Sequence, residues 1–597
     1  MENGEKPPQE DEQLYRIRHS LSHVLAAVVK ELYPDAKLGI GPPIDNGFYY
    51  DFQFAEEFSA NDLKKIQTRM RKVLGRKDAF TLKVMSPEEA TDFFWARNED
   101  FKVELIKDLA AGGETEVTIY EHDNFVDLCK GPHVNNTGDI PARAFVLDRI
   151  AGAYWRGDEK RPMLTRIYGL AFNTREELDA YIKQREEAMK RDSRKVGKEL
   201  ELFTASELVG RGLPLLLPKG ATIRRILERF IVDEELKRGY EHVYTPVLGR
   251  KELYEISGHW EHYQESMYPP IEWEGQSYVL RPMTCPHHFE IYASKPRSYR
   301  DLPLRLAEIS PMFRKEKSGE LYGLIRIMGF HLADAHIFCT TGQLYDEFKA
   351  ILDLINYCME VTGLEEVCWY KASLHDDQKG KFVDNPEGWA LSEKHLLNIL
   401  KEQDRKYELS VGDAAFYGPK LDVQIRTVSG KEETIFTNQI DMVLAERFNL
   451  EYTDADGRKK RPLILHRSSI GCLERTIAFL IEFYAGAFPT WLAPVQVRIL
   501  TISDRQIDYA KNIRDRMLQS KIRVELDIRN ESLNRKIREG RLQKIPYLLI
   551  IGDKEMEAGT VTARNRDTHN QSALPVDKFI QDLAGEEKTY SLKLNCA

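Results

Sequence analysis

The sequence contains few cysteines and no apolar run long enough to cross a membrane. Only seven of the 597 residues are cysteine, at irregular spacing and odd in number, which argues for reduced thiols in a cytosolic protein. No apolar run approaches the roughly 20 residues that a membrane helix needs. The acidic, polar opening "MENGEKPPQEDEQ" is unlike a signal or transit peptide. We therefore expect a soluble, cytoplasmic protein without a membrane partner.

The sequence also lacks an excess of positive charge. Its net charge is −9, with 42% hydrophobic and 30% charged residues, which is typical of a globular protein. No global polycation indicates nucleic-acid binding, so any such contact must use local patches. The chain is too long for one core, and about three or four domains are expected for it.

Periodicity and composition divide the chain into five segments. The middle mixes helices with strand-like runs without regular alternation, which indicates an antiparallel sheet flanked by helices, whereas strand and helix alternate after "FPTWLAP". The predicted segments are 1–12, a loose tail; 13–175, an α+β domain; 176–202, one charged linker helix; 203–488, the antiparallel-sheet domain; and 489–597, an α/β domain.

The first domain carries two pairs of potential ligands at the same spacing. His19 and His23 lie in a helical pattern, on the face opposite its apolar stripe, and "DLCKGPH" places Cys129 and His133 four residues apart. The residues alone leave a metal site and a metal-free hydrolytic pocket about equally open. A purely structural role is the least expected, because both histidines avoid the apolar face of the helix.

Three motifs stand out in segment 203–488, and the second and third suit phosphate or carboxylate binding. They are Gly239, Val243 and Pro246 before two apolar residues; Phe313-Arg314-x-Glu316 followed by Arg326, Phe330 and Asp334; and Gly471-x-x-Glu474-Arg475. Alternating arginine and glutamate on a strand suits an anion and an amine, an aromatic after the loop suits a purine, and a helix N-terminus suits an anion. Each motif alone is explained equally well by a turn, a surface hairpin or a capped helix.

The order of these motifs resembles that of class II aminoacyl-tRNA synthetases. The words "RPMTCPHH", "ADAHIF" and "LILHRSSIG", which contain Cys285, His336 and His466, are similar to those of the threonyl-tRNA synthetase family, and the resemblance spans roughly 13–575. It implies an α+β multidomain protein with an N-terminal α+β editing domain, a class II antiparallel-sheet catalytic core and a C-terminal α/β anticodon-binding domain. The implied reaction is ATP-dependent ligation of L-threonine to tRNA(Thr) through a threonyl-adenylate, with hydrolysis of mischarged seryl-tRNA(Thr).

The resemblance also implies roles for residues of the core. Cys285, His336 and His466 would hold one Zn²⁺ with open positions, to which threonine, unlike valine, can bind through its hydroxyl. The implied catalytic residues are Arg314, Glu316, Arg326 and Arg475. Arg314 and Arg475 would bind the phosphates of ATP, which is accompanied by Mg²⁺. The implied substrate-binding residues are Met283, Phe330, Asp334, Tyr417, Lys420 and Gln439. Asp334 would receive the hydroxyl.

In the outer domains the resemblance implies an editing site and an anticodon site. The editing residues would be His19, His23, Cys129 and His133 with Tyr50, Lys102 and Asp127, and here the resemblance favours a hydrolytic pocket that orients water. The anticodon readers would be Asn530, Glu555 and Arg564, near the basic stretch 535–544. Because the proline motif forms the subunit interface in class II enzymes, a homodimer is also implied.

The chain departs from the family pattern at several positions. The family usually has Gln at Leu332, "WQCGTxQLDF" where this chain has "ETIFTNQIDM", and "KPMNCPGH" where it has "RPMTCPHH". A counterpart of the ubiquitin-like N-terminal domain of bacterial members is not expected. Two alternatives follow, a tRNA-binding paralogue with a decayed aminoacylation site and a free-standing hydrolase of mischarged tRNA. The retained Cys285, His336 and His466 argue against both.

Overall fold

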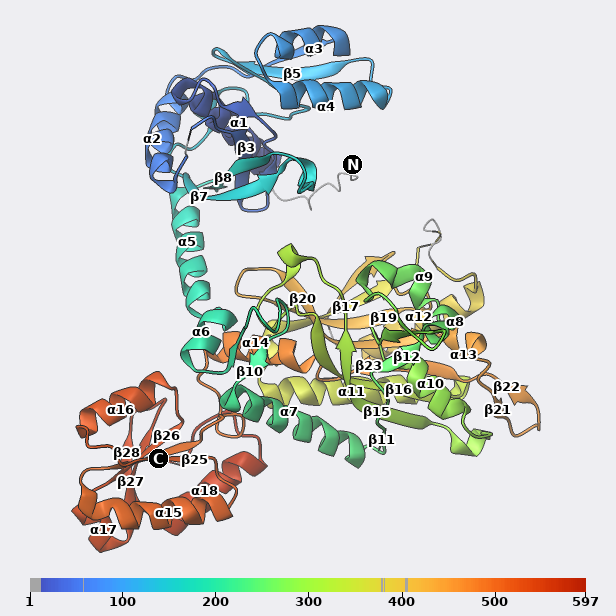
Figure 1. Cartoon of the computed structure of the whole chain (residues 1–597), viewed down its shortest axis with the longest axis vertical. Helices are drawn as coiled ribbons and strands as arrows, with labels where there is room; N and C mark the ends of the chain where they lie inside the picture. The colour runs from blue at the N-terminus through green and yellow to red at the C-terminus, as the bar shows by residue number, and fades with distance from the viewer. Residues whose placement is uncertain (1–11, 57, 377–379, 381, 403–405, 597) are drawn as a thin grey trace. The chain divides into compact units, whose positions relative to one another are not determined.

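The computed structural model describes residues 12–56, 58–376, 380, 382–402 and 406–596. The chain forms two compact units, 1–186 and 187–597, and helix α5 (Arg175–Lys190) runs across the boundary between them (Figure 1). Most of the predicted tail, residues 1–11, lies outside the described part, and α1 already begins at Glu12.

The first unit contains two antiparallel sheets, each covered by helices. The larger has the order β1-β3-β8-β7, with β2 paired to β3, and packs against α1 and α2. The smaller has the order β4-β5-β6 and packs against α3 and α4. Their bounds are α1 Glu12–Leu32, β1 Lys37–Leu38, β2 Pro43–Ile44, β3 Gly47–Gln53, α2 Leu63–Leu74, β4 Thr81–Met85, α3 Pro87–Trp95, α4 Asp100–Ala111, β5 Val117–His122, β6 Phe125–Leu128, β7 Phe145–Tyr154 and β8 Met163–Ala171.

Helix α1 is buried on more than the one face that its apolar stripe predicts. His19 and His23 do lie off the stripe, but their exposed fractions are only 8% and 2%. The loop after β6 covers them, since the Pro132 carbonyl and the Cys129 thiol contact His19. The histidine face is therefore an interior site between two layers of this unit.

The predicted single linker helix over 176–202 is wrong. The segment forms α5 and a separate helix α6 (Ser193–Glu199), because the Asp192 side chain accepts from the Arg194 amide and caps α6. Ser193 then donates to Glu482 at 2.9 Å, which anchors α6 to the core.

The core of the second unit is an eight-stranded sheet of order β11-β15-β16-β23-β20-β19-β17-β18. The pairing is antiparallel except at β11–β15 and β17–β18, so the prediction of a largely antiparallel sheet is confirmed. The strands are β11 Glu241–His242, β15 Leu304–Phe313, β16 Gly329–Cys339, β17 Cys368–Leu374, β18 Tyr407–Val411, β19 Lys420–Arg426, β20 Glu432–Asp441 and β23 Leu463–Ser468.

Long amphipathic helices bury their apolar stripes against this sheet (Figure 1). They are α7 Pro218–Lys237, α11 Leu344–Thr362, α12 Pro386–Glu402 and α14 Leu473–Tyr484. Shorter elements are β9 Phe203–Thr204, β10 Leu215–Leu216, β12 Leu248–Arg250, α8 Lys251–Ile256, α9 His259–Tyr263, β13 Ile271–Trp273, β14 Gln276–Leu280, α10 Cys285–Ala293, α13 Leu444–Arg447, β21 Tyr452–Thr453 and β22 Lys459–Lys460.

The C-terminal part is a five-stranded sheet of order β25-β24-β26-β27-β28. The predicted strands β24, β25 and β26 are parallel, and the antiparallel β27 and β28 extend the sheet. The elements are β24 Val497–Thr501, α15 Ile507–Gln519, β25 Val524–Asp527, α16 Leu533–Leu542, β26 Tyr547–Ile551, α17 Asp553–Ala558, β27 Thr560–Asn565, β28 Gln571–Pro575 and α18 Val576–Lys588.

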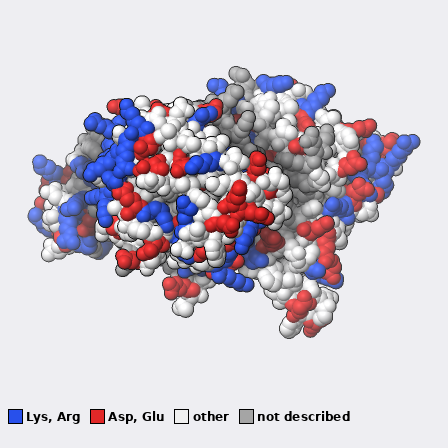
Figure 2. Space-filling model, turned by 90° about the horizontal axis from the view of Figure 1, so that it is seen from above, with Lys and Arg blue, Asp and Glu red and all other residues white. Residues whose placement is uncertain are grey.

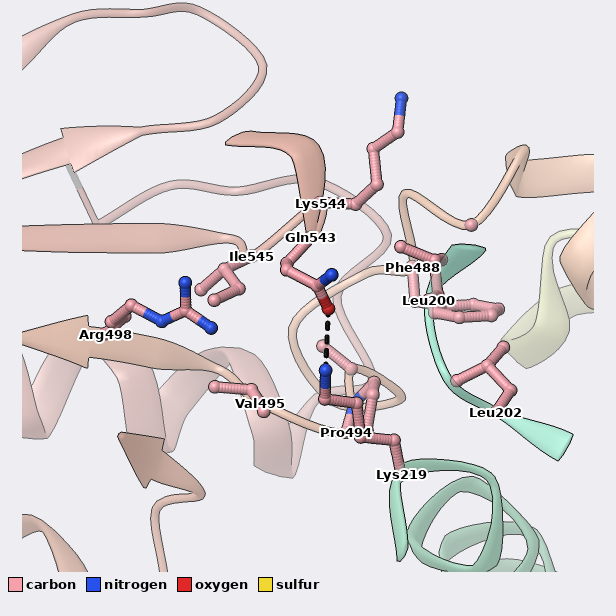
Figure 3. Close-up of a pocket in the computed structure, with 12 residues that line it drawn as sticks. Leu200, Leu202, Lys219, Phe488, Pro494, Val495, Arg498, Gln543, Lys544 and Ile545 are labelled. Carbon is pink, nitrogen blue, oxygen red and sulfur yellow. Dashed lines mark hydrogen bonds between the residues drawn. The ribbon is translucent and has the colours of Figure 1, made fainter. Parts of the chain in front are cut away.

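An apolar seam joins this C-terminal sheet to the core. Leu200, Phe488 and Ile545 line a cavity of only about 20 Å³, and Lys219 donates to Gln543 at 2.6 Å beside it (Figure 3). Because the cavity has room for about one water molecule, the seam serves packing and offers no space for a larger ligand.

The surface carries both signs of charge. Figure 2 shows basic and acidic side chains intermixed on the face in view, in keeping with the net charge of −9. Within the described residues, no helix is both long and apolar enough to cross a membrane.

Candidate active sites

The core sheet brings the predicted substrate and metal residues into one cross-strand row. His336 on β16 pairs in register with His466 on β23, His466 pairs with Gln439 on β20, and Gln439 pairs with Lys420 on β19. Residues paired across antiparallel strands have adjacent side chains. The row therefore places residues from four distant parts of the chain side by side.

The sulfur of Cys285 and the ring nitrogens of His336 and His466 lie within 4.8 Å of one another. Cys285 begins α10, which packs over this part of the sheet. His466 directs Nε2 to Asp441 at 2.8 Å, whereas Nε2 of His336 is buried and has no hydrogen-bond partner among the described residues. One thiol and two imidazoles, one of which has an unsatisfied nitrogen, fit a Zn²⁺ ion with a free position.

The local charges prepare this group for a cation. Burial raises the pKa of Cys285 and lowers that of His336 well below its ordinary value. Burial opposes protonation of His466 as well, but the neighbouring Cys285 and Asp441 outweigh it and raise the pKa of His466 to about 10. A proton shared in this way between a thiol and an imidazole is one that a bound metal ion displaces.

A cavity of about 540 Å³ opens beside the group. Among the predicted residues, those that line it are Met283, Cys285, Arg314, Glu316, Arg326, Asp334, Tyr417, Lys420, Gln439 and His466. Tyr417 donates to Gln439 at 2.6 Å, and burial raises the pKa of Asp334. Its size and polar lining suit a small charged substrate.

Arg475, Phe330 and His336 are not part of this lining but lie directly behind it. Arg475 donates to the Ile325 and Thr434 carbonyls. After burial, its charge is the largest cause of the lowered pKa of Arg314, so the two guanidinium groups are neighbours. Phe330 lies under Arg314, 5.4 Å from the guanidinium carbon to the ring centre.

The second motif forms a hairpin whose loop is held by ion pairs. Arg326 donates to Glu316 at 2.8 Å and pairs with Glu320 at 2.7 Å. Gly471 of the third motif has φ +72°, and a Cβ there would lie 2.0 Å from the Ile435 carbonyl oxygen. Only glycine permits this approach, and it sets the start of α14.

The departures from the family pattern lie at the cavity and at an irregularity of the sheet, where the pairing of β19 with β20 shifts register between Val423 and Gln424, opposite Phe436 and Thr434. Leu332 lines the cavity, and the Thr434 hydroxyl accepts from Gln424 on the adjacent strand at 2.8 Å. The Thr434 backbone still holds Arg475. Arg475 is therefore held by main-chain carbonyls, which do not depend on the side chain at position 434.

The first unit gathers the second His/Cys set. Potential ligand atoms of His19, His23, Cys129 and His133 all lie within 4.8 Å of one another. Cys129 sulfur lies 3.2 Å from Nε2 of His19 and 3.3 Å from Nε2 of His133. Ser20, on α1, contacts Nδ1 of His133 at 3.1 Å and fixes that ring.

A buried carboxylate stands behind this set. Asp127 accepts from Tyr50 at 2.6 Å and pairs with Lys102 at 2.6 Å, and its oxygen lies 3.8 Å from Nε2 of His23. All four side chains are at most 3% exposed. The predicted editing residues therefore form one contiguous cluster.

Burial keeps the imidazoles and the thiol of this cluster uncharged at neutral pH. It lowers the pKa of His19 to about 4 and that of His133 to about 2, and raises that of Cys129 to about 12. Neutral imidazoles can accept a proton from water or bind a metal ion. The geometry is compatible with either reading of this site.

The predicted anticodon-binding residues of the C-terminal sheet are more dispersed than the residues of the other two sites. Asn530 is exposed after β25, and Glu555, on α17, accepts from Thr562 at 2.7 Å. Arg564 lies on β27 two residues beyond Thr562, on the same partly exposed face. In the basic stretch 535–544, Lys536 is buried and donates to the Thr501 carbonyl, so its ammonium group is not part of a basic surface.

Three family models match: "tRNA synthetase class II core domain (G, H, P, S and T)" over 269–484, "Anticodon binding domain" over 496–586 and "Threonyl and Alanyl tRNA synthetase second additional domain" over 117–168. The chain is 48% identical to a threonine–tRNA ligase from a Geobacillus species over 96% of this chain and 88% of the relative.

The chain belongs to the threonyl-tRNA synthetase family. Threonine–tRNA ligase 1 of Bacillus subtilis is 47% identical over 97% of this chain and 89% of its own length. The solved RNA-binding domain of a threonyl-tRNA synthetase from Cryptosporidium parvum has a TM-score of 0.63 and 33% identity, over 68% of this chain and 99% of that structure. The predicted fold classes are those of this synthetase family.

Sequence reasoning passed over two groups in the core of this synthetase. Arg467 lines the cavity and is fully buried, paired with Glu235 at 2.6 Å. His288, next to the metal group, contacts His336. The local sequence around Arg467 does not indicate its role, because its partner Glu235 lies on α7. His288, in contrast, is part of the motif "RPMTCPHH", so the sequence could have indicated it.

Proposed function

We propose that this protein ligates L-threonine to tRNA(Thr) through a threonyl-adenylate and hydrolyses mischarged seryl-tRNA(Thr). The observation that carries the proposal is the juxtaposition of Cys285, His336 and His466 with a polar cavity lined by Arg314 and Asp334. The relatives named as threonine–tRNA ligases support the choice of threonine.

The metal group would select the amino acid. Cys285, His336 and His466 would hold Zn²⁺, which supplies a Lewis-acid position for the amino and hydroxyl groups of threonine. Asp334, buried beside it, would accept the hydrogen of the hydroxyl. Valine has no such hydroxyl, and an apolar pocket alone separates near-isosteres only weakly.

The arginines would stabilise the reacting phosphates. The charge of Arg475 contributes, after burial, to the lowered pKa of Arg314, so the two guanidinium groups would act together as positive charge in the pocket. That charge would hold the ATP phosphates, with their Mg²⁺, as the threonine carboxylate attacks the α-phosphate and pyrophosphate leaves. Glu316 and Arg326 would hold the loop over the nucleotide, with Phe330 supporting Arg314.

Selection by a metal ion would not distinguish serine from threonine. The first unit would therefore remove serine that has been attached to tRNA(Thr). Serine has the same amino and hydroxyl groups as threonine, and one methyl group is worth only about 1–3 kcal/mol. His19, His23, Cys129 and His133, with Asp127, Lys102 and Tyr50 behind them, would orient water toward the ester of seryl-tRNA. The family resemblance favours a metal-free pocket of this kind, and the neutral imidazoles of His19 and His133 are compatible with it.

The C-terminal sheet would read the anticodon, and a second copy of the chain would complete the enzyme. Asn530, Glu555 and Arg564 are the proposed readers. Beside the proline motif, Tyr244 is 93% exposed and Trp273 is 67% exposed, and such apolar surface supports a homodimer contact. All seven cysteines are free thiols, in keeping with a reducing cytoplasm.

The decisive experiment is ATP–pyrophosphate exchange with threonine, serine and valine, followed by deacylation of preformed seryl-tRNA(Thr). We expect exchange with threonine and serine but not with valine, and rapid hydrolysis of the seryl ester only. Exchange with valine at the threonine rate would overturn the metal-based selection. Absence of any exchange with threonine would instead support a decayed aminoacylation site.

A further inference from the structure

The metal group of the core is backed by a buried chain of hydrogen bonds that reaches His336. Nδ1 of His336 lies 2.9 Å from Nδ1 of His288. Nε2 of His288 lies 3.4 Å from Glu308, and Glu308 accepts from Arg281 at 2.9 Å and from the Thr245 hydroxyl at 2.7 Å. The side chains of His336, His288, Glu308 and Arg281 are each at most 2% exposed. No proton donor or acceptor from bulk water competes along this chain.

The two ends of the chain fix the direction of every hydrogen bond in it. Hydrogen bonds from His288, Thr245 and Arg281 outweigh burial and lower the pKa of Glu308 to about 2, so Glu308 only accepts, as its contacts with the two donors Arg281 and Thr245 require. Nε2 of His288 must then carry the hydrogen that faces Glu308. In a neutral imidazole the other nitrogen has none, so Nδ1 of His288 accepts from Nδ1 of His336.

Because the single hydrogen of a neutral His336 ring is on Nδ1, its Nε2 has none. This atom is the buried nitrogen that has no partner within the described part of the chain, and a ring nitrogen of His336 lies within 4.8 Å of the ligand atoms of Cys285 and His466. A neutral nitrogen with a free lone pair is the form that binds a metal ion. The orphaned atom and the direction of the hydrogen bonds therefore agree.

We propose that Glu308 and His288 act as positioning residues that hold His336 in the tautomer that binds the metal ion. This inference rests on the proposed zinc site. It assigns a role to His288 and Glu308, which are not among the residues that line the cavity. It also gives Arg281 the function of orienting Glu308. The neighbouring His287 has no such role, since its ring packs near Gly249 and Tyr254.

The test measures the affinity for Zn²⁺ itself. The full-length protein is stripped with a chelator, and Zn²⁺ is returned in competition with a chromophoric chelator. His288→Leu removes the acceptor for His336 and should weaken binding about 10- to 100-fold. His288→Asn can place its amide oxygen near the position of Nδ1 and should restore most of the affinity. His287→Leu changes the adjacent histidine, which is 9% exposed; it is the control and should bind as the wild type does.

A second variant reverses the chain without changing its shape. Arg281 requires an oxygen, so Glu308→Gln turns its amide NH₂ toward His288, which reverses both hydrogen bonds and leaves a hydrogen on Nε2 of His336. It should also weaken binding about 10-fold or more. Co²⁺ substitution gives an independent readout, because the thiolate–cobalt absorption should shift or fade in His288→Leu and Glu308→Gln but not in His287→Leu.

The outcomes separate this inference from the proposed function. If the wild type binds no Zn²⁺, or if Cys285→Ala binds it equally well, the proposed zinc site is wrong. If the wild type binds Zn²⁺ through Cys285 while Glu308→Gln keeps the wild-type affinity and cobalt spectrum, the positioning role is wrong. An equal loss in His287→Leu also overturns it. Glu308→Gln decides the matter if His288→Leu does not fold.

Discussion

His336 and His466 lie opposite each other in register on the adjacent strands β16 and β23. Neither position is near the other in sequence, yet antiparallel pairing places their rings 4.7 Å apart, centre to centre. Cys285 reaches the same point from the first turn of α10. The proposed metal-binding group therefore depends on the strand register of the sheet and on the position of the first turn of α10.

Removal of the thiol should abolish both metal binding and threonine activation. Cys285→Ala deletes one of the three ligands, so we expect loss of the approximately one Zn²⁺ per chain that three protein ligands would hold, and loss of threonine-dependent pyrophosphate exchange. Metal analysis and exchange assays measure the two effects. Cys339→Ala, a buried cysteine at the end of β16, is the control. A zinc-free Cys285→Ala enzyme with full activity contradicts the assignment.

Loss of either motif arginine should slow adenylate formation. Arg314→Ala and Arg475→Ala each remove positive charge from the pocket where phosphate charge develops, which commonly costs about 10²-fold or more. Pyrophosphate exchange at saturating threonine measures this. Arg426→Ala, which removes an exposed arginine paired with Glu432, should have little effect. Near-normal exchange in either motif variant would show that the motif is misassigned.

Disruption of the first unit's cluster should separate charging from editing. His23→Ala or Cys129→Ala should leave threonine charging almost unchanged while seryl-tRNA(Thr) accumulates, because the cluster lies in a different unit from the core cavity. Deacylation of preformed seryl-tRNA(Thr) is the assay, with Cys368→Ala as the control.

A chelator added to the same assay distinguishes the two readings of this cluster. If hydrolysis continues in a strong chelator, the metal-free pocket is supported, and if it stops on chelation alone, the site requires a metal ion. Normal hydrolysis by a variant lacking His19, His23 and Cys129 together would refute the editing assignment.

Substitution of the proposed anticodon readers should affect only the steps that need tRNA. Alanine at Asn530, Glu555 or Arg564 should weaken tRNA charging and leave pyrophosphate exchange intact, since adenylate formation uses the core cavity. Lys578→Ala on α18 is a control because its side chain pairs locally with Asp582. Equal loss in both assays would indicate a damaged fold instead.

Much of the architecture was determined by local pattern. Strand-like runs predicted an antiparallel sheet in the middle segment, which contains strands such as β15 and β19, and strand–helix alternation predicted the parallel β24, β25 and β26. The spacing of His19 and His23 predicted that both lie on one helix face, which the structure confirms. Periodicity of this kind is visible in sequence because it follows the repeat of the backbone itself.

Tertiary structure alone decided which side chains meet and in what state. The sequence did not show that α1 is buried on its histidine face, that Asp192 divides the linker into two helices, or that Lys536 lies inside. Nor did it show that Glu308 and His288 stand behind His336. These facts depend on strand register and on packing between distant segments, and contacts of that kind leave no periodic trace along the chain.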